Sequence, residues 1–284
     1  MKIIRSLHEM QQSAEALRRS GKRIGVVPTM GYLHEGHASL MRIARRQSDH
    51  VITTIFVNPM QFAPNEDYAR YPRDLDRDIQ IAESAGTDIL FTPEANEIYP
   101  NGYLTHVHVE QLSTLLEGKF RPTHFKGVTT VVAKIFHLTK PHLAVFGQKD
   151  IQQVMIIKKM VKDLDFDIEI IVGPTVREPD GLAMSSRNVY LKEAERQQST
   201  VLHRSLRHAE NRIESGERNA QIIIDEVNRL ISAQPAATID YISIADPVTL
   251  QELRTIQPST EAIVSLAVRF GSTRLIDNIM VKVP

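Results

Sequence analysis

Apolar and polar positions divide the first 176 residues into short apolar runs separated by stretches of helical spacing. The runs are rich in β-branched residues and lie at 24–27, 51–57, 88–91, 143–146 and 168–172. Nearly continuous apolar runs are typical of strands that are covered on both faces of a parallel sheet. We therefore expect five central strands of one parallel sheet.

Between these runs, apolar residues recur at helical spacing over 39–46, 73–85, 128–138 and 151–163. In the second stretch Leu75, Ile79 and Ala82 stand at i, i+4 and i+7, on one helix face. Strands that alternate with helices predict crossover connections between parallel strands. The pattern predicts a doubly wound, Rossmann-like α/β domain.

The pattern changes after Gly173-Pro174. Two charged stretches of helical spacing, 192–215 and 220–233, are followed by apolar runs at 240–245, 262–269 and 275–283. The last two runs are separated by Phe270-Gly271-Ser272-Thr273, which is typical of a hairpin turn. We predict a second, smaller α+β domain, with domain ranges of 1–176 and 177–284.

Composition and charge narrow the possible functions. The chain has 34 Lys and Arg against 34 Asp and Glu, so no net charge attracts it to nucleic acid or an anionic membrane. It has no cysteine, which excludes thiol catalysis, thiolate metal sites and disulfides. No apolar stretch is long enough to span a membrane. We expect a cytoplasmic protein. Any site that binds an anion must depend on a local group of residues and not on the net charge of the chain.

The first candidate site follows the run at 24–27, where residues 28–37 read PTMGYLHEGH. His34 and His37 stand at a predicted helix start, near unpaired backbone N–H groups and the positive end of the helix dipole, where a phosphate is stabilised. Gly36 would let a flat ligand lie against the backbone. Two alternatives stay open: both histidines are surface loop residues, or the pair binds zinc, although no third ligand is near in sequence.

The second candidate lies at the domain boundary, where residues 176–188 read VREPDGLAMSSRN. Hydroxyls and a guanidinium on a mobile loop could close over a polyphosphate. The alternative is an Asp-Gly turn followed by a serine that caps a helix.

Together, His-x-Gly-His after the first strand and Met-Ser-Ser-Arg after the last resemble the two signatures of the adenylate-forming nucleotidyltransferase superfamily. In the aminoacyl-tRNA synthetases of that superfamily, lysines flank Met-Ser. Here these positions are Ala183 and Ser186, and the positive charge is displaced to Arg187. With the further blocks FVNPMQF at 56–62 and GQKDIQQ at 147–153, the whole chain resembles the pantothenate synthetase family.

The resemblance implies an ATP-dependent ligase. Pantoate and ATP would give pantoyl adenylate and pyrophosphate, and β-alanine would then attack the acyl group to release pantothenate and AMP. Mg²⁺ should accompany the ATP, and the family suggests a homodimer. The smaller domain would act as a lid with its hinge near 184–188. The rivals are a nucleotidylyltransferase, which would release no AMP, and an RNA-binding synthetase-like protein.

The resemblance also implies roles for individual residues. The residues implied in catalysis are His34, His37, Lys149, Ser185 and Arg187. Those implied in ATP binding are Pro28, Thr29, Met30, His34, Gly36, His37, Gly147, Lys149, Asp150, Val176, Met184, Ser185, Ser186 and Arg187. Asp150 suits the ribose hydroxyls, although Lys149 and Asp150 could instead form a helix-start ion pair.

Pantoate would be bound by the amides of Gln61 and Gln153. Met30 and Phe56 would form an apolar wall, and Asn58 should lie near a phosphate or the incoming amine. No protein side chain is assigned as a metal ligand.

Two further features are expected to be unrelated to function. The arginines at 42, 45, 46, 204 and 207 should lie on solvated helix faces, because acidic residues are interspersed along the chain. His106 and His108 should alternate along a half-exposed strand.

Overall fold

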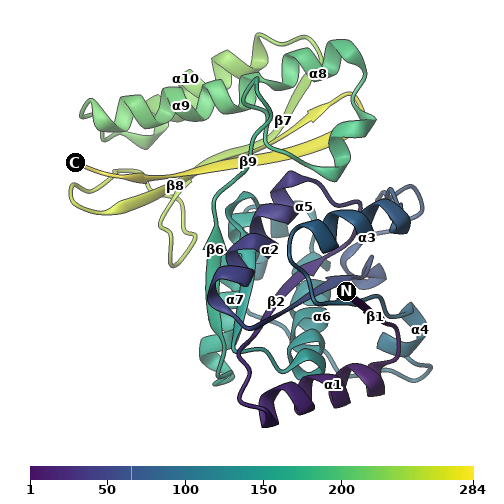
Figure 1. Cartoon of the computed structure of the whole chain (residues 1–284). Coiled ribbons are helices and arrows are strands. Elements are labelled where there is room, and N and C mark those ends of the chain that lie inside the picture. Colours follow the sequence, from purple (N-terminus) through teal and green to yellow (C-terminus); the bar gives the residue numbers. More distant parts are fainter. Residues whose placement is uncertain (65) are drawn as a thin grey trace.

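The computed structural model describes residues 1–64 and 66–284 and contains a six-stranded parallel sheet (Figure 1). Its strand order is β1-β4-β3-β2-β5-β6. The bounds are β1 Lys2–Ile4, β2 Ile24–Thr29, β3 His50–Ile55, β4 Ile89–Phe91, β5 Leu143–Gly147 and β6 Glu169–Gly173. The five expected strands and the doubly wound sheet are confirmed.

Helices cover both faces of this sheet. Val26 and Phe146 pack in one core with α1 (Leu7–Arg19), α6 (His124–Thr139) and α7 (Ile151–Asp163). Val27 and Val145, which point to the opposite face, pack with α2 (Glu35–Gln47) and α3 (Leu75–Ser84). Because successive strand residues face opposite sides and both sides are buried, the strands read as continuous apolar runs.

A three-stranded antiparallel sheet follows, in the order β7-β8-β9. Its strands are β7 Ala237–Ala245, β8 Glu261–Phe270 and β9 Thr273–Lys282, and its helices are α8 Glu193–Ser199, α9 Val201–Glu214 and α10 Ala220–Ser232. Phe270 pairs with Thr273 across a two-residue turn, and Gly271 has a φ of +58°. The expected hairpin is confirmed.

The two sheets define what we call the six-stranded unit and the three-stranded unit. In Figure 1 the three-stranded sheet lies between helices α8–α10 and the six-stranded unit. It has its own buried core, which includes Leu206, Ile223 and Leu266. The remaining short elements are α4 Ala95–Ile98, α5 Glu117–Phe120 and the single turns η1 Pro59–Gln61, η2 Leu112–Thr114, η3 Gln148–Asp150 and η4 Ser186–Tyr190.

The expected single helix over 192–215 is wrong, because the structure has α8 and α9 with a break at Thr200. The side chains of Ser199 and Thr200 donate hydrogen bonds to the carbonyls three residues earlier. Such local bonds compete with the helix backbone and interrupt it.

The expected strand through His106 and His108 is also wrong. This segment is extended but forms no strand among the described residues, and both histidines are exposed. It lies along α6 through side-chain hydrogen bonds: Val107 N donates to Thr130 Oγ1 (3.0 Å), and Thr129 Oγ1 donates to Val107 O (2.7 Å).

Residues 177–183 are attached to the three-stranded unit, whereas Ser186 and Arg187 also contact the six-stranded unit. Arg177 forms a bidentate pair with Asp277 of β9, at 2.6 and 3.0 Å. Leu182 is buried in the core of that unit, and Asn188 donates to Glu178 within the segment. A hinge near 184–188 does not agree with these contacts, and the passage between the units lies at 174–176.

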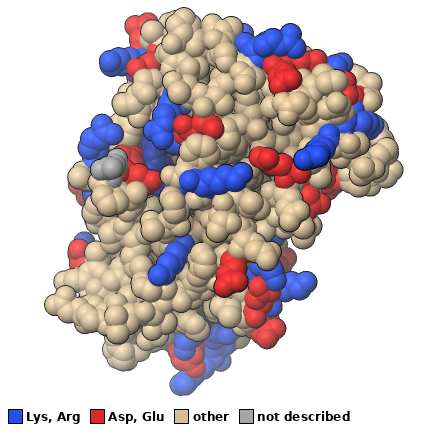
Figure 2. Space-filling model, turned by 180° about the vertical axis from the view of Figure 1, so that it is seen from behind, with Lys and Arg blue, Asp and Glu red and all other residues tan. Residues whose placement is uncertain are grey.

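Basic residues on α2 and α9 have acidic partners. The pairs are Arg42–Glu35, Arg45–Asp88 and Arg207–Glu210. On the face shown in Figure 2, basic and acidic side chains are interspersed. Within the described part of the chain, none of the helices has the length and apolar character needed to cross a membrane.

Candidate active site

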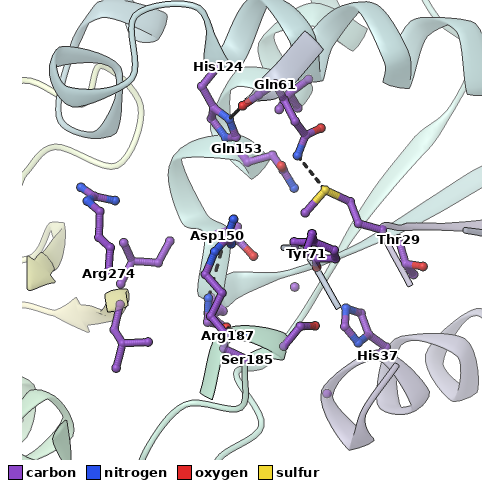
Figure 3. Close-up of a pocket in the computed structure, with 18 of the residues that line it drawn as sticks. Thr29, His37, Gln61, Tyr71, His124, Asp150, Gln153, Ser185, Arg187 and Arg274 are labelled. Carbon is purple, nitrogen blue, oxygen red and sulfur yellow. Dashed lines mark hydrogen bonds and ion pairs between the residues drawn. The ribbon is translucent and has the colours of Figure 1, made fainter. Parts of the chain in front are cut away.

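A cleft of about 370 Å³ lies at the carboxyl ends of β2 and β5, between the two units. Ligand sites of parallel sheets are found at this edge, and the volume is within the usual range. Every residue expected in the site lines the cleft: Pro28, Thr29, Met30, His34, Gly36, His37, Phe56, Asn58, Gln61, Gly147, Lys149, Asp150, Gln153, Val176, Met184, Ser185, Ser186 and Arg187. The two candidate segments, about 150 positions apart, therefore meet at one cavity (Figure 3).

A tight turn connects the end of β2 to His34. Gly31 and Tyr32 both have positive φ, +80° and +49°. The buried carboxylate of Asp78, on α3, accepts hydrogen bonds from Tyr32 N (2.8 Å) and Leu33 N (2.6 Å). Burial raises the pKa of Asp78, and these two bonds act in the opposite direction. Asp78 thus holds the left-handed turn that sets the start of α2.

His34 and His37 cap the helix with one nitrogen each. His34 Nδ1 accepts from Gly36 N (3.1 Å), and His37 Nδ1 accepts from His34 N (3.3 Å). A neutral imidazole that accepts at Nδ1 carries its proton on Nε2. Each ring therefore keeps an Nε2–H donor, and the two ring centres are 4.1 Å apart.

This geometry corrects the expectation of free backbone donors for four amides at the helix start. The amides of His37 and Ala38 donate to His34 O, and those of His34 and Gly36 are capped by the rings. The imidazole Nε2–H groups are donors that remain for a ligand at this helix start. Gly36 is also needed within the protein, because a Cβ there would lie 2.8 Å from the His34 ring.

Both histidines are neutral near pH 7. Burial, reinforced by the positive charge of Lys149, lowers the pKa of His34 to about 4. Burial and the neighbouring His34 ring lower the pKa of His37 well below its usual value. The site therefore offers neutral hydrogen-bond donors at the helix start, and the full positive charge comes from other side chains.

Lys149 and Asp150 lie on η3, directly after β5. Their side chains form a loose pair, with Lys149 Nζ 4.0 Å from Asp150 Oδ1. The Asp150 side chain is half exposed. Both groups remain available to a ligand in the cleft.

Asn58 is buried, and all its hydrogen-bonding groups are used. Its Nδ2 donates to Gln61 Oε1 (3.1 Å) and Gly127 O (3.0 Å), while its Oδ1 accepts from Met60 N (3.3 Å) and Tyr99 OH (2.9 Å). Direct binding of a phosphate or an amine by Asn58 does not agree with this geometry. Asn58 instead orients Gln61.

Gln61 and Gln153 extend into the cleft from η1 and α7 (Figure 3). The Gln61 Nε2 atom lies 3.0 Å from the Met30 sulfur. The apolar wall beside these amides includes Phe56, with Val128 and Val131 of α6. Such a pocket suits a small ligand that carries both hydroxyl and methyl groups.

Ser185 is the N-cap of η4, and Ser186 is its first residue. Ser185 Oγ accepts from Arg187 N (3.2 Å), so its own hydrogen is left for another acceptor. Ser186 Oγ donates to Tyr32 O (3.2 Å), which ties the start of η4 to the turn before His34. Ser186 therefore joins the two candidate segments directly.

Arg187 is held by Asp67, which sequence reasoning missed. Arg187 Nε and Nη2 donate to the two Asp67 oxygens at 2.9 Å each. Burial acts to raise the pKa of Asp67, but the bond from Arg187 gives a net lowering. The guanidinium also lies 5.5 Å from the Tyr71 ring centre. Nη1 remains free of this pairing and available for a ligand.

A second arginine pair was missed as well. Arg121 donates to both oxygens of Glu66 (2.7 and 2.5 Å) and to Gln61 O (3.2 Å). Gln61 O also accepts from His124 Nδ1 at 2.9 Å, and burial lowers the pKa of His124 to about 3. Glu66 and Arg121 lie in irregular segments without periodicity, and His124 is the first residue of α6. The charge-dense stretch at 66–73 was the available signal.

No cluster of three or more His, Asp or Glu residues suited to a metal ion occurs within 1–64 and 66–284.

Comparison with known proteins assigns the family. The family model described as pantoate-beta-alanine ligase matches residues 2–280. The chain belongs to the pantoate-beta-alanine ligase family. The pantothenate synthetase of Chloroherpeton thalassium is 53% identical over 279 residues, which cover 98% of each chain.

Two solved structures of this family resemble the fold. Pantothenate synthetase from Thermus thermophilus is 44% identical, with a TM-score of 0.91 over 98% of this chain and 99% of that chain. Pantoate-beta-alanine ligase from Francisella tularensis, complexed with beta-gamma ATP and beta-alanine, is 38% identical, with a TM-score of 0.81 over 99% and 97%.

Proposed function

We propose that this cleft forms pantoyl adenylate from pantoate and ATP and then transfers the pantoyl group to β-alanine. As a pantoate-beta-alanine ligase, the chain condenses pantoate with β-alanine using ATP. The observation that carries the two-step route is the meeting of the 28–37 and 184–187 segments at one cleft. That arrangement allows a polyphosphate to be held from two sides.

In the first step the pantoate carboxylate attacks the α-phosphorus of ATP, and pyrophosphate leaves. His34 and His37 donate Nε2–H bonds to phosphate oxygens, and the Lys149 ammonium neutralises charge that develops on them. Ser185 Oγ–H and Arg187 Nη1 approach from the opposite side. Positioning and charge neutralisation suffice for this transfer, and no covalent nucleophile is required.

The nucleoside part of ATP would lie against one wall of the cleft. This wall is formed by Pro28, Thr29, Met30, Gly36, Gly147, Val176 and Met184. The half-exposed Asp150 carboxylate would accept hydrogen bonds from the ribose hydroxyls. Mg²⁺ enters as part of the MgATP substrate, held by phosphate oxygens.

Pantoate would lie between the Gln61 and Gln153 amides, with its methyl groups against Met30 and Phe56. Amides both donate and accept, which matches a ligand with hydroxyl and carboxylate groups. Asn58 acts on this step through Gln61, whose amide it holds.

In the second step the β-alanine amine attacks the acyl carbon of the adenylate, and AMP leaves. The Francisella relative was solved with beta-alanine, which supports a subsite for this amine in the family. We propose that residues 1–176 and 177–284 act as two domains, with 174–176 as the hinge. Closure of the second domain excludes water, which would hydrolyse the adenylate.

We also propose that the chain is a cytoplasmic homodimer. The extended segment around Leu104, which is 86% exposed, offers main-chain groups to another strand. Within residues 1–64 and 66–284, the amides of Leu104, Thr105 and His106 have no backbone acceptor. Such a segment suits strand pairing with a second copy. Light scattering of the wild-type chain, compared with a Leu104→Pro variant, tests this.

One assay tests the reaction. The protein is mixed with MgATP and pantoate, then with β-alanine, while AMP and pyrophosphate are measured. We expect the formation of pyrophosphate to require pantoate, and the formation of pantothenate to require β-alanine. Formation of ADP contradicts the proposal, and so does ATP turnover at the same rate with and without pantoate.

Two variants test the phosphate site. Lys149→Ala and His34→Ala should abolish adenylate formation while the fold persists. His34→Ala should also lower the free energy of unfolding by about 1 kcal/mol, because a helix cap is lost. Full activity in either variant, at unchanged ATP affinity, would remove that residue from the site.

A further inference from the structure

A side chain of the three-stranded unit reaches the turn that carries Lys149. Asn278, on β9, donates from Nδ2 to Gln148 O at 3.0 Å and to Lys149 O at 2.8 Å. Both hydrogens of one amide are thus used on two consecutive carbonyls of η3. Asn278 is almost completely buried.

The turn has little else to fix it. η3 is a single three-residue turn between β5 and α7, and no described residue caps it or the start of α7 with its side chain. The orientation of its carbonyls sets the direction in which the Lys149 side chain leaves the backbone. Two hydrogen bonds from outside the turn therefore restrict where the ammonium can lie.

Asn278 has an energetic cost that its two bonds must offset. Its Oδ1 atom is buried and has no hydrogen-bond partner among the described residues. Unsatisfied buried acceptors destabilise a fold, and an apolar residue would avoid this cost. The contact with η3 is what an apolar residue at this position could not supply.

The position of Asn278 depends on how the two units are packed. Its backbone N–H donates to Asp277 Oδ1 (2.8 Å), and Asp277 forms the bidentate pair with Arg177. Asn278 is therefore fixed to the segment that follows the hinge. A rotation about 174–176 would carry its amide away from the carbonyls of Gln148 and Lys149.

We propose that Asn278 is a positioning residue that directs Lys149 toward the ATP phosphates when the two units are packed together. This inference rests on the proposed role of Lys149 in ATP binding. It makes the placement of the ammonium a consequence of domain closure. An open enzyme would bind ATP with this charge poorly placed.

A double-mutant cycle on ATP binding tests the inference. MgATP titrations of the wild-type chain, Asn278→Ala, Lys149→Ala and the double variant give four dissociation constants. We expect Asn278→Ala alone to weaken ATP binding about five- to tenfold. In the Lys149→Ala background it should cause no further loss, because the residue acts through Lys149. The KM for pantoate should stay unchanged in Asn278→Ala.

Asn219→Ala is the matched control. Asn219 belongs to the same unit and accepts a hydrogen bond from Gln221 N (3.0 Å) as the N-cap of α10, which lies on the far side of the three-stranded sheet from the six-stranded unit (Figure 1). This variant should leave ATP binding unchanged with and without Lys149. Asn278→Ser, which is too short to reach both carbonyls, replaces the alanine variant if that variant does not fold.

The outcomes are distinguishable. Wild-type ATP affinity in Asn278→Ala, or an equal loss in the Lys149→Ala background, overturns the inference and leaves the proposed function standing. If the wild-type chain does not bind MgATP, both fail together.

Discussion

His34 and His37 each serve two purposes with two nitrogen atoms. Nδ1 closes the first turn of α2, and Nε2–H is left for a ligand. The cap fixes the tautomer, and burial fixes the neutral charge state. The same local contacts that begin the helix therefore leave one neutral donor on each ring for a ligand.

This charge state predicts loss of stability in mild acid. The pKa of His34 is about 4 in the folded chain, against 6.5 in the unfolded chain. Between these values the unfolded state binds more protons, so stability falls as the pH drops from 6.5 to 4. The full loss from His34 is about 3 kcal/mol.

Chemical denaturation at several pH values measures this. His34→Asn is the matched variant, because asparagine caps helices well and does not titrate. It should flatten the dependence of the unfolding free energy on pH between 7 and 5. An unchanged slope would contradict a neutral, depressed His34.

Gln61→Ala should raise the KM for pantoate about 10- to 100-fold, because a buried amide partner of the ligand is lost. The KM for ATP should change little, since the phosphate donors lie on other elements. Steady-state kinetics with each substrate varied measures both constants. Equal increases in both constants would assign Gln61 a structural role only.

At the scale of the elements, Gly127 is the point where α6 comes closest to η1. A Cβ on Gly127 would lie 2.4 Å from Met60 O, and Gly127 O also accepts from Asn58. Gly127→Ala must push η1 away and disturb the residues that hold Gln61. We expect a loss of about 2–4 kcal/mol in unfolding free energy, measured by urea denaturation.

Gly147→Ala is the control for that variant. Among the described residues, its added Cβ would meet only Leu40 Cδ1, at an ordinary 3.7 Å. Its unfolding free energy should stay within about 0.5–1 kcal/mol of wild type. Equal losses in the two variants would show that the crowding at Gly127 is not the cause.

The strands that the sequence predicted well are those covered on both faces, such as β2 and β5. β1 and α1 were missed for physical reasons. β1 has three residues at the sheet edge, and α1 is mostly polar, with Met10 and Ala14 as its fully buried residues. Neither gives a long periodic signal, and both are fixed by tertiary pairing.

At the scale of the whole molecule, an ion cluster joins the two units. Arg274 of β9 donates to both oxygens of Glu117 on α5 (2.6 and 2.9 Å) and to Asp240 of β7 (2.5 Å). The Glu117 and Arg274 side chains are 8% and 15% exposed. Removing one partner of such a pair leaves a poorly solvated charge.

Glu117→Ala should therefore cost about 2–4 kcal/mol and loosen the packing of the units. Thermal unfolding measures the first effect, and faster proteolysis near 174–176 measures the second. Lys159→Ala is the control, since its pair with Asp163 is half exposed and should contribute under about 0.5 kcal/mol. If Glu117→Ala is cleaved near 174–176 at the same rate as the wild-type chain, this ion cluster does not hold the two units together.

The sequence located the segments of the site but not their partners. Motifs predicted that His34, Lys149 and Arg187 share one cleft, because the carboxyl ends of parallel strands meet at one edge. Asp67 and Asn278 could not be found this way. Their contacts join segments more than 100 residues apart, in loops and on another sheet, and only the packed structure brings them together.

The arginine pairs at the cleft limit which groups of a bound anion can reach them. Arg187 and Arg121 already hold carboxylates of the chain in two-point contact. A chloride, sulfate or free phosphate ion would have to compete with such a carboxylate without the further contacts that a longer anion makes. A triphosphate can bind the imidazoles and Lys149 first and engage the arginines afterwards. Small anions should therefore compete with ATP chiefly at the imidazoles and Lys149, and less at the arginines.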